Sequence, residues 1–296
     1  MPAQVISGTQ IAAEIREELK ERVKKLNEKG VTPTLAVVLV GEDPASISYV
    51  TAKAKGAEEI GMHEETIRLP ADTPEEEVIR TVDKLNEDAK FHGILVQLPL
   101  PKHVSTEKVI NYISPEKDVD AFHPINVGKL LRGERCPLPC TPHGVQELLI
   151  RSGNDPGGKH VVICGRSNIV GKPLAAILIQ KKQGANATVT ICHTGTKDIA
   201  SFSKQADIVV AAMGAPKALT ADMVKDGAVV IDVGVNRVED KTREKGFRLV
   251  GDVDFDAVKE KASAITPVPG GVGPMTVTML LMNTVEAAEI KAGMTG

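Results

Sequence analysis

The chain has 296 residues, of which 42% are hydrophobic and 25% are charged, a composition typical of a globular protein with one large or two ordinary domains. A net charge of −3, only 2% aromatic residues and no Trp exclude a strongly basic nucleic-acid surface with rings for stacking on bases. Four scattered cysteines exclude a disulfide scaffold, and neither a signal-peptide pattern nor an apolar run of membrane-spanning length is present. We therefore expect a cytoplasmic protein that binds neither nucleic acid nor membrane.

The first hundred residues alternate between helix and strand patterns. Apolar residues at spacings of three or four between Ile11 and Leu26 predict an amphipathic helix that ends at Gly30. The unbroken apolar run 34–40 predicts a strand that is covered on both faces. Further elements are predicted as a helix over about 46–60, a strand near 66–69, a helix over about 74–89 and a strand over 93–98. This order predicts a parallel sheet with right-handed crossovers.

The segment 113–143 is rich in Pro, Gly and charged residues, and we expect it to cross between two domains. Cys136 and Cys140 within it have a CxxxC spacing, but no second pair of ligands follows, so no metal site is predicted. A second alternating unit begins with a strand over 160–165. Its further strands are predicted at 187–193, 206–214, 228–234 and 249–253.

The last predicted helix, over about 275–290, has apolar residues on more than one face and must be buried. We expect residues 275–296 to pack on the first domain. The predicted fold class is therefore α/β, with a three-layer α/β catalytic domain over 1–145, a Rossmann-like dinucleotide-binding domain over 146–274, and a cleft between them.

The segment VVICGRSNIVGKP (161–173) predicts a phosphate-binding turn between a buried strand and a helix. Gly165 and Gly171 bracket the turn, and Ser167 stands where a dinucleotide fingerprint has its second Gly. The GxSxxxG spacing is one residue longer than GxGxxG, so it also fits an ordinary strand-to-helix turn. A buried strand that runs directly into glycine nevertheless favours a pyrophosphate held at a helix N-terminus.

The next strand indicates which dinucleotide would bind. A site for NAD places Asp or Glu near the end of this strand, whereas here Thr190 and His193 occupy the end and no acid is present. Arg166, directly after Gly165, supplies a cation for a 2′-phosphate. The sequence therefore favours NADP over NAD, although His193 is equally compatible with a merely solvated strand end.

Candidate catalytic residues cluster in the first half of the chain. Tyr49 and Lys53 lie at i and i+4 of a predicted helix, a spacing that also fits a surface lysine beside a half-buried tyrosine. Gln97 ends a buried strand, where open α/β sheets place ligand-binding groups. Asp118 and Asp120 follow in the loop EKDVDAFHP. A buried lysine has a lowered pKa and suits proton transfer at neutral pH, and Asp120 could pair with a nitrogen-rich heterocycle.

Six blocks appear together and in order: YVTAK (49–53), GILVQLPLP (93–101), EKDVDAFHPINVG (116–128), PCTPHG (139–144), GRSNIVGKP (165–173) and ITPVPGGVGPMT (265–276). With them the chain resembles the bifunctional methylenetetrahydrofolate dehydrogenase/methenyltetrahydrofolate cyclohydrolase family over nearly its whole length. The resemblance implies oxidation of 5,10-methylenetetrahydrofolate by NADP, hydrolysis of the methenyl product to 10-formyltetrahydrofolate, and a homodimer assembled through the second domain.

The resemblance also implies roles for individual residues. Lys53 would be the catalytic lysine of the hydrolytic step with Gln97 tuning it, Tyr49 would pack on the folate, and Asp120 would hold the pterin edge. The remaining folate contacts would be Val96, Leu98, Pro269, Gly270, Gly271, Val272 and Gly273, and the dinucleotide contacts would be Gly165, Arg166, Ser167, Thr190, His193 and Ile231. One departure is Ala121, where glycine is frequent, and it puts the local loop geometry in doubt.

Two other functions remain open from the residues alone. Another two-domain NADP oxidoreductase, similar to shikimate or amino-acid dehydrogenases, would also combine a catalytic lysine with a Rossmann-like domain, but it does not explain QLPLP followed by KDVD. A non-catalytic NADP-binding sensor on the same scaffold would not need the set Tyr49, Lys53, Gln97 and Asp120.

Overall fold

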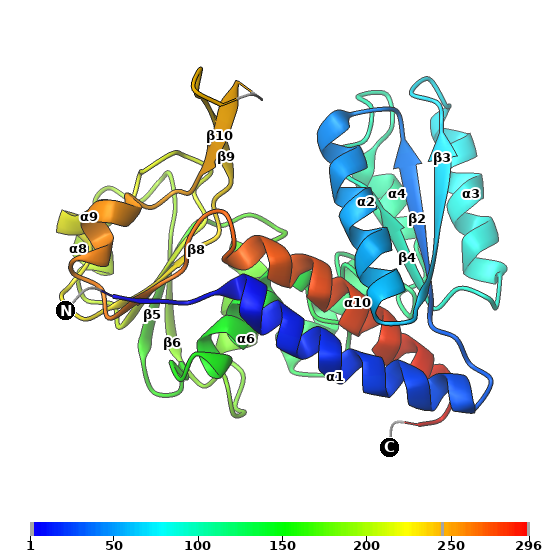
Figure 1. The fold of residues 1–296 in the computed structure, drawn as a ribbon, viewed down its shortest axis with the longest axis horizontal. Helices are drawn as coiled ribbons and strands as arrows, with labels where there is room; N and C mark the ends of the chain where they lie inside the picture. The colour runs from blue at the N-terminus through cyan, green and yellow to red at the C-terminus, as the bar shows by residue number, and fades with distance from the viewer. Residues whose placement is uncertain (1–2, 244–245, 295–296) are drawn as a thin grey trace. The chain divides into compact units, whose positions relative to one another are not determined.

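A computed structural model describes residues 3–243 and 246–294, which form two compact units (Figure 1). Unit 1 contains the described residues up to Ala12 together with Thr141–Thr276. Unit 2 contains Ala13–Cys140 and the described residues from Val277 onward. The boundaries between the units therefore fall inside three helices, α1 (Gly8–Glu28), α6 (Cys140–Arg151) and α10 (Val272–Lys291).

Unit 2 is built on a three-stranded parallel sheet in the order β3-β2-β4. The central strand β2 (Thr34–Val40) is buried at every residue, which is why its sequence is apolar without alternation. Helices α2 (Pro44–Glu59) and α3 (Glu75–Glu87) connect it to β3 (His63–Leu69) and β4 (Gly93–Val96), and they cover opposite faces of the sheet (Figure 1). This arrangement confirms the predicted parallel sheet.

The C-terminal helix completes unit 2 from Val277 onward. Met279, Leu281 and Val285 of α10 are fully buried, and the side-chain amide of Asn283 donates to the carbonyls of Val119 and Leu138 at 2.7 and 2.8 Å. Neighbouring α1 is tied to α10 by paired hydrogen bonds from Arg22 to Glu289 at 2.7 and 2.9 Å. The apolar residues on several faces of α10 are thus explained by neighbours on several sides.

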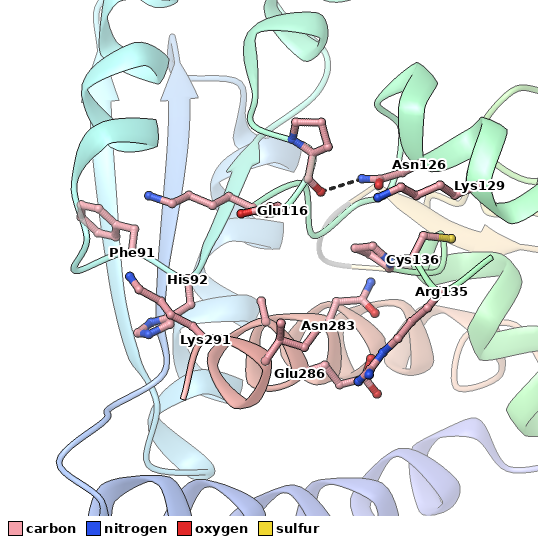
Figure 2. Close-up of a pocket in the computed structure, with 15 residues that line it drawn as sticks. Phe91, His92, Glu116, Asn126, Lys129, Arg135, Cys136, Asn283, Glu286 and Lys291 are labelled. Carbon is pink, nitrogen blue, oxygen red and sulfur yellow. Dashed lines mark hydrogen bonds between the residues drawn. The ribbon is translucent and has the colours of Figure 1, made fainter. Parts of the chain in front are cut away.

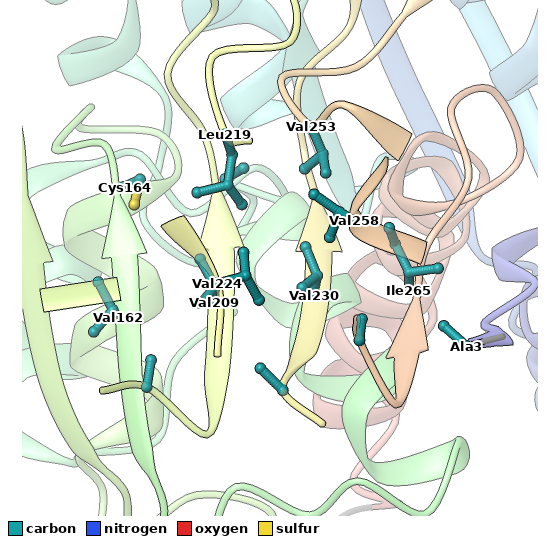
Figure 3. Close-up of a cluster of buried hydrophobic side chains, with 14 of the residues drawn as sticks. Ala3, Val162, Cys164, Val209, Leu219, Val224, Val230, Val253, Val258 and Ile265 are labelled. Atoms are coloured by element: carbon teal, nitrogen blue, oxygen red, sulfur yellow. The ribbon is translucent and has the colours of Figure 1, made fainter. Parts of the chain in front are cut away.

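Unit 1 contains a six-stranded parallel sheet in the order β1-β11-β8-β7-β5-β6. Its core is formed by small β-branched and aliphatic side chains such as Val162, Val209, Val230 and Ile265 (Figure 3). The strands are β1 (Gln4–Val5), β5 (His160–Cys164), β6 (Thr188–Cys192), β7 (Ile208–Ala211), β8 (Val229–Asp232) and β11 (Ala264–Ile265). Helices α7 (Gly171–Leu178), α8 (Ala200–Ser203) and α9 (Phe255–Lys259) and the short 3-10 turn Ala221–Met223 lie between them.

Three features differ from the sequence-based expectations. The chain begins in unit 1, because β1 pairs with β11 there, although residues 1–145 were expected to form one domain. The segment 113–143 does cross from unit 2 into unit 1 as expected, but it is not irregular throughout, because it follows α4 (Thr106–Tyr112) and contains α5 (Pro124–Arg132) and the start of α6 (Cys140–Arg151).

The strand predicted at 249–253 is the third difference. Residues 247–250 form β10 (Phe247–Val250), which pairs antiparallel with β9 (Asn236–Glu239) in a separate two-stranded ribbon and not in the parallel sheet. The two strands of this ribbon are only partly buried, so the apolar pair Leu249-Val250 was a misleading sign of a sheet core. No helix in the described part of the chain is long and apolar enough to cross a membrane.

Candidate active site

Helix α2 positions the candidate catalytic lysine. Its first turn is capped by Asp43, whose carboxylate accepts from the Ser46 N–H at 2.8 Å, and Pro44 occupies the first helical position. Tyr49 and Lys53 then lie one turn apart, but their environments differ: Lys53 is only 9% exposed, whereas Tyr49 is 51% exposed. Lys53 is therefore a buried amine and not a surface lysine.

Gln97 meets this amine at the carboxyl end of β4. The Lys53 Nζ donates to Gln97 Oε1 at 2.8 Å, and Gln97 Nε2 donates to the Leu98 carbonyl at 2.6 Å. The contact with Leu98 fixes which end of the amide is nitrogen, because a backbone carbonyl can only accept, and Oε1 is then left to accept from Lys53. Val96 is the buried last residue of β4, and the peptide bond between Leu98 and Pro99 is cis.

The loop after residue 116 carries Asp120, whose carboxylate acts on Lys53. The Ile94 N–H of β4 donates to the Lys117 carbonyl, so the loop runs beside the strand. Buried Asp118 accepts from the His123 N–H at 2.8 Å and from Asn126 Nδ2 at 2.9 Å, which holds the turn closed. Ala121 adopts φ +59°, the left-handed conformation that explains why glycine suits this position.

Burial shifts the pKa values of three neighbouring side chains, Lys53, Asp120 and Cys140. It lowers the pKa of Lys53, against the opposing attraction of the Asp120 carboxylate. It raises the pKa of Asp120 to about 6, against the opposing effect of Lys53. It also raises the pKa of the Cys140 thiol, so this group stays protonated and donates to the Val119 carbonyl at 3.3 Å. Burial therefore moves the pKa values of the amine and the carboxyl group toward each other.

A glycine turn follows β5 in unit 1. Gly165 has φ +141°, and a Cβ there would lie 2.1 Å from the Ala212 carbonyl oxygen. A Cβ on Gly171 would lie 2.1 Å from the Gly165 carbonyl oxygen. The backbone at the start of α7 thus approaches the end of β5 more closely than any side chain allows, as in turns that hold a pyrophosphate.

The groups around this turn are mostly backbone donors and exposed side chains. Ser167 Oγ accepts from the N–H groups of Val170 and Gly171 at 3.1 and 3.4 Å, and therefore holds the turn that leads into α7. Arg166 is exposed beside it. His193 follows β6 and accepts from the Gly195 N–H through Nδ1 at 3.0 Å, which leaves Nε2 to carry the ring proton.

The PGGVG segment packs on the start of α1 within unit 1. The Thr9 N–H donates to the Gly270 carbonyl at 3.1 Å, and a Cβ on Gly8 would lie 1.7 Å from the Gly271 carbonyl oxygen. Gly271 and Val272 are buried, whereas Pro269 and Gly273 are exposed. Only part of this segment can therefore touch a ligand.

Comparison with known proteins shows the family. The catalytic-domain profile of tetrahydrofolate dehydrogenase/cyclohydrolase matches residues 6–120, and the profile of its NAD(P)-binding domain matches residues 139–292. The chain belongs to the tetrahydrofolate dehydrogenase/cyclohydrolase family. The predicted resemblance is confirmed, and the alternative oxidoreductases and the non-catalytic sensor are not supported.

Individual relatives cover the chain from end to end. The bifunctional protein FolD of Dehalococcoides mccartyi strain CBDB1 is 58% identical over 99% of both chains, and that of Syntrophus aciditrophicus is 56% identical over 99% of this chain and 100% of its own. The crystal structure of FolD from Campylobacter jejuni has a TM-score of 0.92 at 47% identity and covers 98% of this chain and 99% of its own. The Trypanosoma brucei FolD structure, complexed with NADP cofactor and inhibitor, has a TM-score of 0.92 at 43% identity and covers 99% of both chains.

The side chains of two residues predicted at the dinucleotide site, Thr190 and Ile231, are turned to other neighbours or buried, and their contact with the dinucleotide stays a prediction. Thr190 is in the middle of β6, and its Oγ1 lies 3.0 Å from Nε2 of His160, the first residue of β5. The glycine turn is at the other end of β5. Ile231 is fully buried within β8, so its side chain offers no surface to a ligand.

Two buried carboxylates at the ends of β7 and β8 were missed by the sequence analysis. Asp252 accepts from the N–H groups of Met213, Gly214 and Ala215 at 2.5 to 3.0 Å. Asp232 accepts from those of Gly234, Asp252 and Val253 at 2.9 to 3.0 Å. Asp232 could have been singled out in the sequence, because it is an acid at the end of an apolar strand. No sequence pattern pointed to the buried contacts of Asp252 or of the Cys140 thiol. The described residues contain no cluster of three or more His, Cys, Asp or Glu side chains suited to a metal ion.

Proposed function

We propose that the chain oxidises 5,10-methylenetetrahydrofolate to the methenyl form with NADP and then hydrolyses that product to 10-formyltetrahydrofolate. The observation that carries the hydrolytic half is the contact between Lys53 Nζ and Gln97 Oε1 at the carboxyl end of β4, beside Asp120. The family membership of the chain supports the same pair of reactions.

The hydrolytic step needs a group that can take and return a proton. Water attacks the carbon between N5 and N10, loses a proton as the new C–O bond forms, and the ring nitrogen leaves as an amine once it is protonated. A neutral Lys53 can accept the first proton and give back the second, because its buried amine has a lowered pKa. Gln97 holds the Nζ in place through its acceptor oxygen, and Asp120 accepts from the N–H groups of the pterin edge.

The oxidative step needs positioning more than proton transfer. NADP, when bound, accepts the hydride, and the positive charge left on the folate is shared by N5 and N10, so no strong base is required. The glycine turn at Gly165 and the N-terminus of α7, whose N-cap residue Val170 offers no side-chain hydrogen bond, fit a pyrophosphate. Exposed Arg166 fits a 2′-phosphate, and β6 ends without the carboxylate that would repel it.

The remaining contacts follow from exposure. We keep Tyr49, Leu98, Pro269 and Gly273 as folate contacts because they offer surface, and we keep Ser167 and His193 beside the dinucleotide. The contacts of Thr190 and Ile231 stay predictions for the reasons given above. A cytoplasmic homodimer joined through unit 1 is part of the proposal, and sedimentation that shows only an active monomer at micromolar concentration would remove the dimer.

A coupled absorbance assay tests both reactions. Methylenetetrahydrofolate and NADP should give NADPH together with a transient methenyl-folate band, which then decays faster than in buffer. The same mixture with NAD should react more slowly. Absence of the methenyl band with NADP would refute the dehydrogenase, and decay no faster than in buffer would refute the hydrolase.

A further inference from the structure

Unit 2 has a second cavity at the other end of its sheet from Lys53 (Figure 2). Its volume is about 410 Å³, within the range of small-molecule sites. Phe91 and His92, which precede β4, form one side, whereas Gln97 follows β4. The cavity therefore lies at the amino end of the strand, and the candidate catalytic residues lie at its carboxyl end.

The cavity combines apolar walls with an excess of positive charge. Phe91, Pro115, Pro137 and Ile290 supply the apolar surface. Lys117, Lys129, Arg135 and Lys291 line it against only two carboxylates, Glu116 and Glu286. An apolar ligand with a negative charge fits this balance better than a neutral or cationic one.

Two of the four cations are already engaged. Lys117 Nζ donates to the carbonyls of Leu85, Asn86 and Asp88 at 2.7 to 2.9 Å, and Lys291 Nζ donates to the Ala89 carbonyl at 2.6 Å. Lys129 and Arg135 make no hydrogen bond through their side chains to any residue that the structure describes. These two are the cations not tied to a carbonyl, although the charge of Arg135 also acts on the Glu286 carboxylate.

A buried amide in the wall has half of its hydrogen bonds unmade. Asn283 is 3% exposed, and its Nδ2 donates to two carbonyls, which fixes the orientation of the amide. Its Oδ1 is buried with no partner among the described residues, a costly state for an acceptor. Figure 2 shows Asn283 at the centre of the lining, on α10. A ligand with an N–H or O–H group would satisfy it.

We propose that this cavity binds a small aromatic organic anion that carries a hydrogen-bond donor. Its acidic group would pair with Lys129 and Arg135, its ring would cover Phe91 and Ile290, and its donor would reach Asn283 Oδ1.

The cavity wall also contacts the loop that carries Asp120. Asn283 holds the Val119 carbonyl, and Asn126, which lines the cavity as well, donates to Asp118 Oδ2 at 2.9 Å. Occupancy of the cavity is thereby coupled to the residues on either side of Asp120, and by reciprocity to folate binding there. This coupling rests on the proposed function, whereas the binding site does not.

Cys136 gives a readout of binding that needs no activity. It lines the cavity and is partly exposed, whereas Cys140, Cys164 and Cys192 are buried. The rate of its alkylation by iodoacetamide, followed by peptide mass analysis, should fall at least fivefold with millimolar indole-3-acetate, which has a ring, a carboxylate and an N–H. Equal protection by uncharged indole-3-acetamide or by acetate alone would overturn the proposal, and so would no protection by indole-3-acetate. 1-Methylindole-3-acetate, which lacks the donor, should protect less, and equal protection would exclude Asn283 as its partner.

Substitution of the two cations tests where the acidic group of the ligand binds. Lys129→Gln/Arg135→Gln should abolish the protection, expressed relative to each protein's own unprotected rate. Lys24→Gln/Lys25→Gln, which removes two exposed cations of α1 in the same unit, should retain it. Protection that survives in the first variant would place the ligand elsewhere.

The coupling is then measured separately. Indole-3-acetate should change the hydrolysis rate of methenyltetrahydrofolate at least twofold in the wild-type chain and not in Lys129→Gln/Arg135→Gln. Protection of Cys136 without a change in rate would overturn the coupling and leave the site. Protection in a chain with no hydrolysis at all would refute the proposed function and not the site.

Discussion

The carboxyl ends of the two sheets carry different chemical groups, side chains in unit 2 and mostly backbone groups in unit 1. In unit 2, the end of β4 brings together a buried amine and a neutral amide, with Lys53 on Gln97, and the Asp120 carboxylate acts on the amine. In unit 1, the end of β5 is a turn of backbone groups around Gly165, with an exposed cation at Arg166. The same position in a parallel sheet therefore serves two purposes.

The difference comes from the free energy that is needed to bury a charged group. A low-dielectric environment moves the pKa values of an amine and a carboxyl group toward neutrality, which suits proton transfer. A turn of fixed N–H groups with an exposed guanidinium does not titrate near neutral pH and suits the binding of phosphates. We assign proton chemistry to the first end and dinucleotide binding to the second.

Removal of the buried amine should have the largest effect. Lys53→Met keeps the stem and removes the ammonium, and hydrolysis should fall by about 10²- to 10⁴-fold, the usual loss for a general acid–base. NADPH formation should lose only a positioning contribution. Lys55→Met, an exposed lysine on the same helix, is the matched control and should leave both rates unchanged. Hydrolysis within about tenfold of wild type would reduce Lys53 to a binding residue.

Removal of the exposed cation should act on one cofactor only. Arg166→Gln should weaken NADP binding by about 10- to 100-fold, the worth of one or two charge-assisted hydrogen bonds, and leave NAD binding unchanged. Titration of both dinucleotides by calorimetry gives the comparison. Lys159→Gln, at the opposite end of β5, is the control and should affect neither. An equal loss for NADP and NAD would separate Arg166 from the 2′-phosphate.

The Asp120 carboxylate should determine where the hydrolysis rate falls on the acidic side of its pH profile. Because the pKa of Asp120 is raised to about 6, the folded protein takes up its proton as the pH falls through that value, and hydrolysis should decline there. Asp120→Asn should remove this limb. Since the carboxylate also raises the pKa of Lys53, its loss should move the lysine's own limb to lower pH. A profile of rate against pH in which the variant still titrates near 6 would assign that limb to another group.

The smallest effect is expected at Ala121. Relief of its left-handed backbone by Ala121→Gly should stabilise, but the lost buried methyl and the more flexible unfolded chain should offset this, for a net change below about 0.5 kcal/mol. Ala121→Val should lower the free energy of unfolding by about 2 kcal/mol, because a branched side chain fits that conformation poorly. Urea denaturation measures both, and a Gly variant more than about 1.5 kcal/mol less stable would contradict this balance.

The sequence was most informative where burial alone determines structure. The continuous apolar runs of β2, β5, β7 and β8 predicted strands, because a strand covered on both faces has no polar side. Strand β1 has two exposed residues and exists only because β11 offers a partner, so no local pattern could predict it. Helix α5 could have been predicted, because Pro124 stands at its start and Gly133, at φ +72°, follows its end.

The candidate site divides in the same way. Lys53 and Gln97 could be paired from helix spacing and a strand end, since both positions follow from regular geometry. Thr190 lies in the middle of β6, where its hydroxyl meets His160, and its place beside the dinucleotide stays a prediction. The Asp232 and Asp252 carboxylates accept from backbone N–H groups of loops far apart in sequence, and such contacts follow no residue spacing that a sequence shows.

The central claim is that proton chemistry resides in unit 2 and dinucleotide binding in unit 1. Its most direct test is the rate of methenyltetrahydrofolate hydrolysis, without dinucleotide, in Lys53→Met and Arg166→Gln side by side. Our account predicts a loss of at least about 100-fold in Lys53→Met and a rate within about threefold of wild type in Arg166→Gln. Comparable losses in the two variants would contradict the assignment.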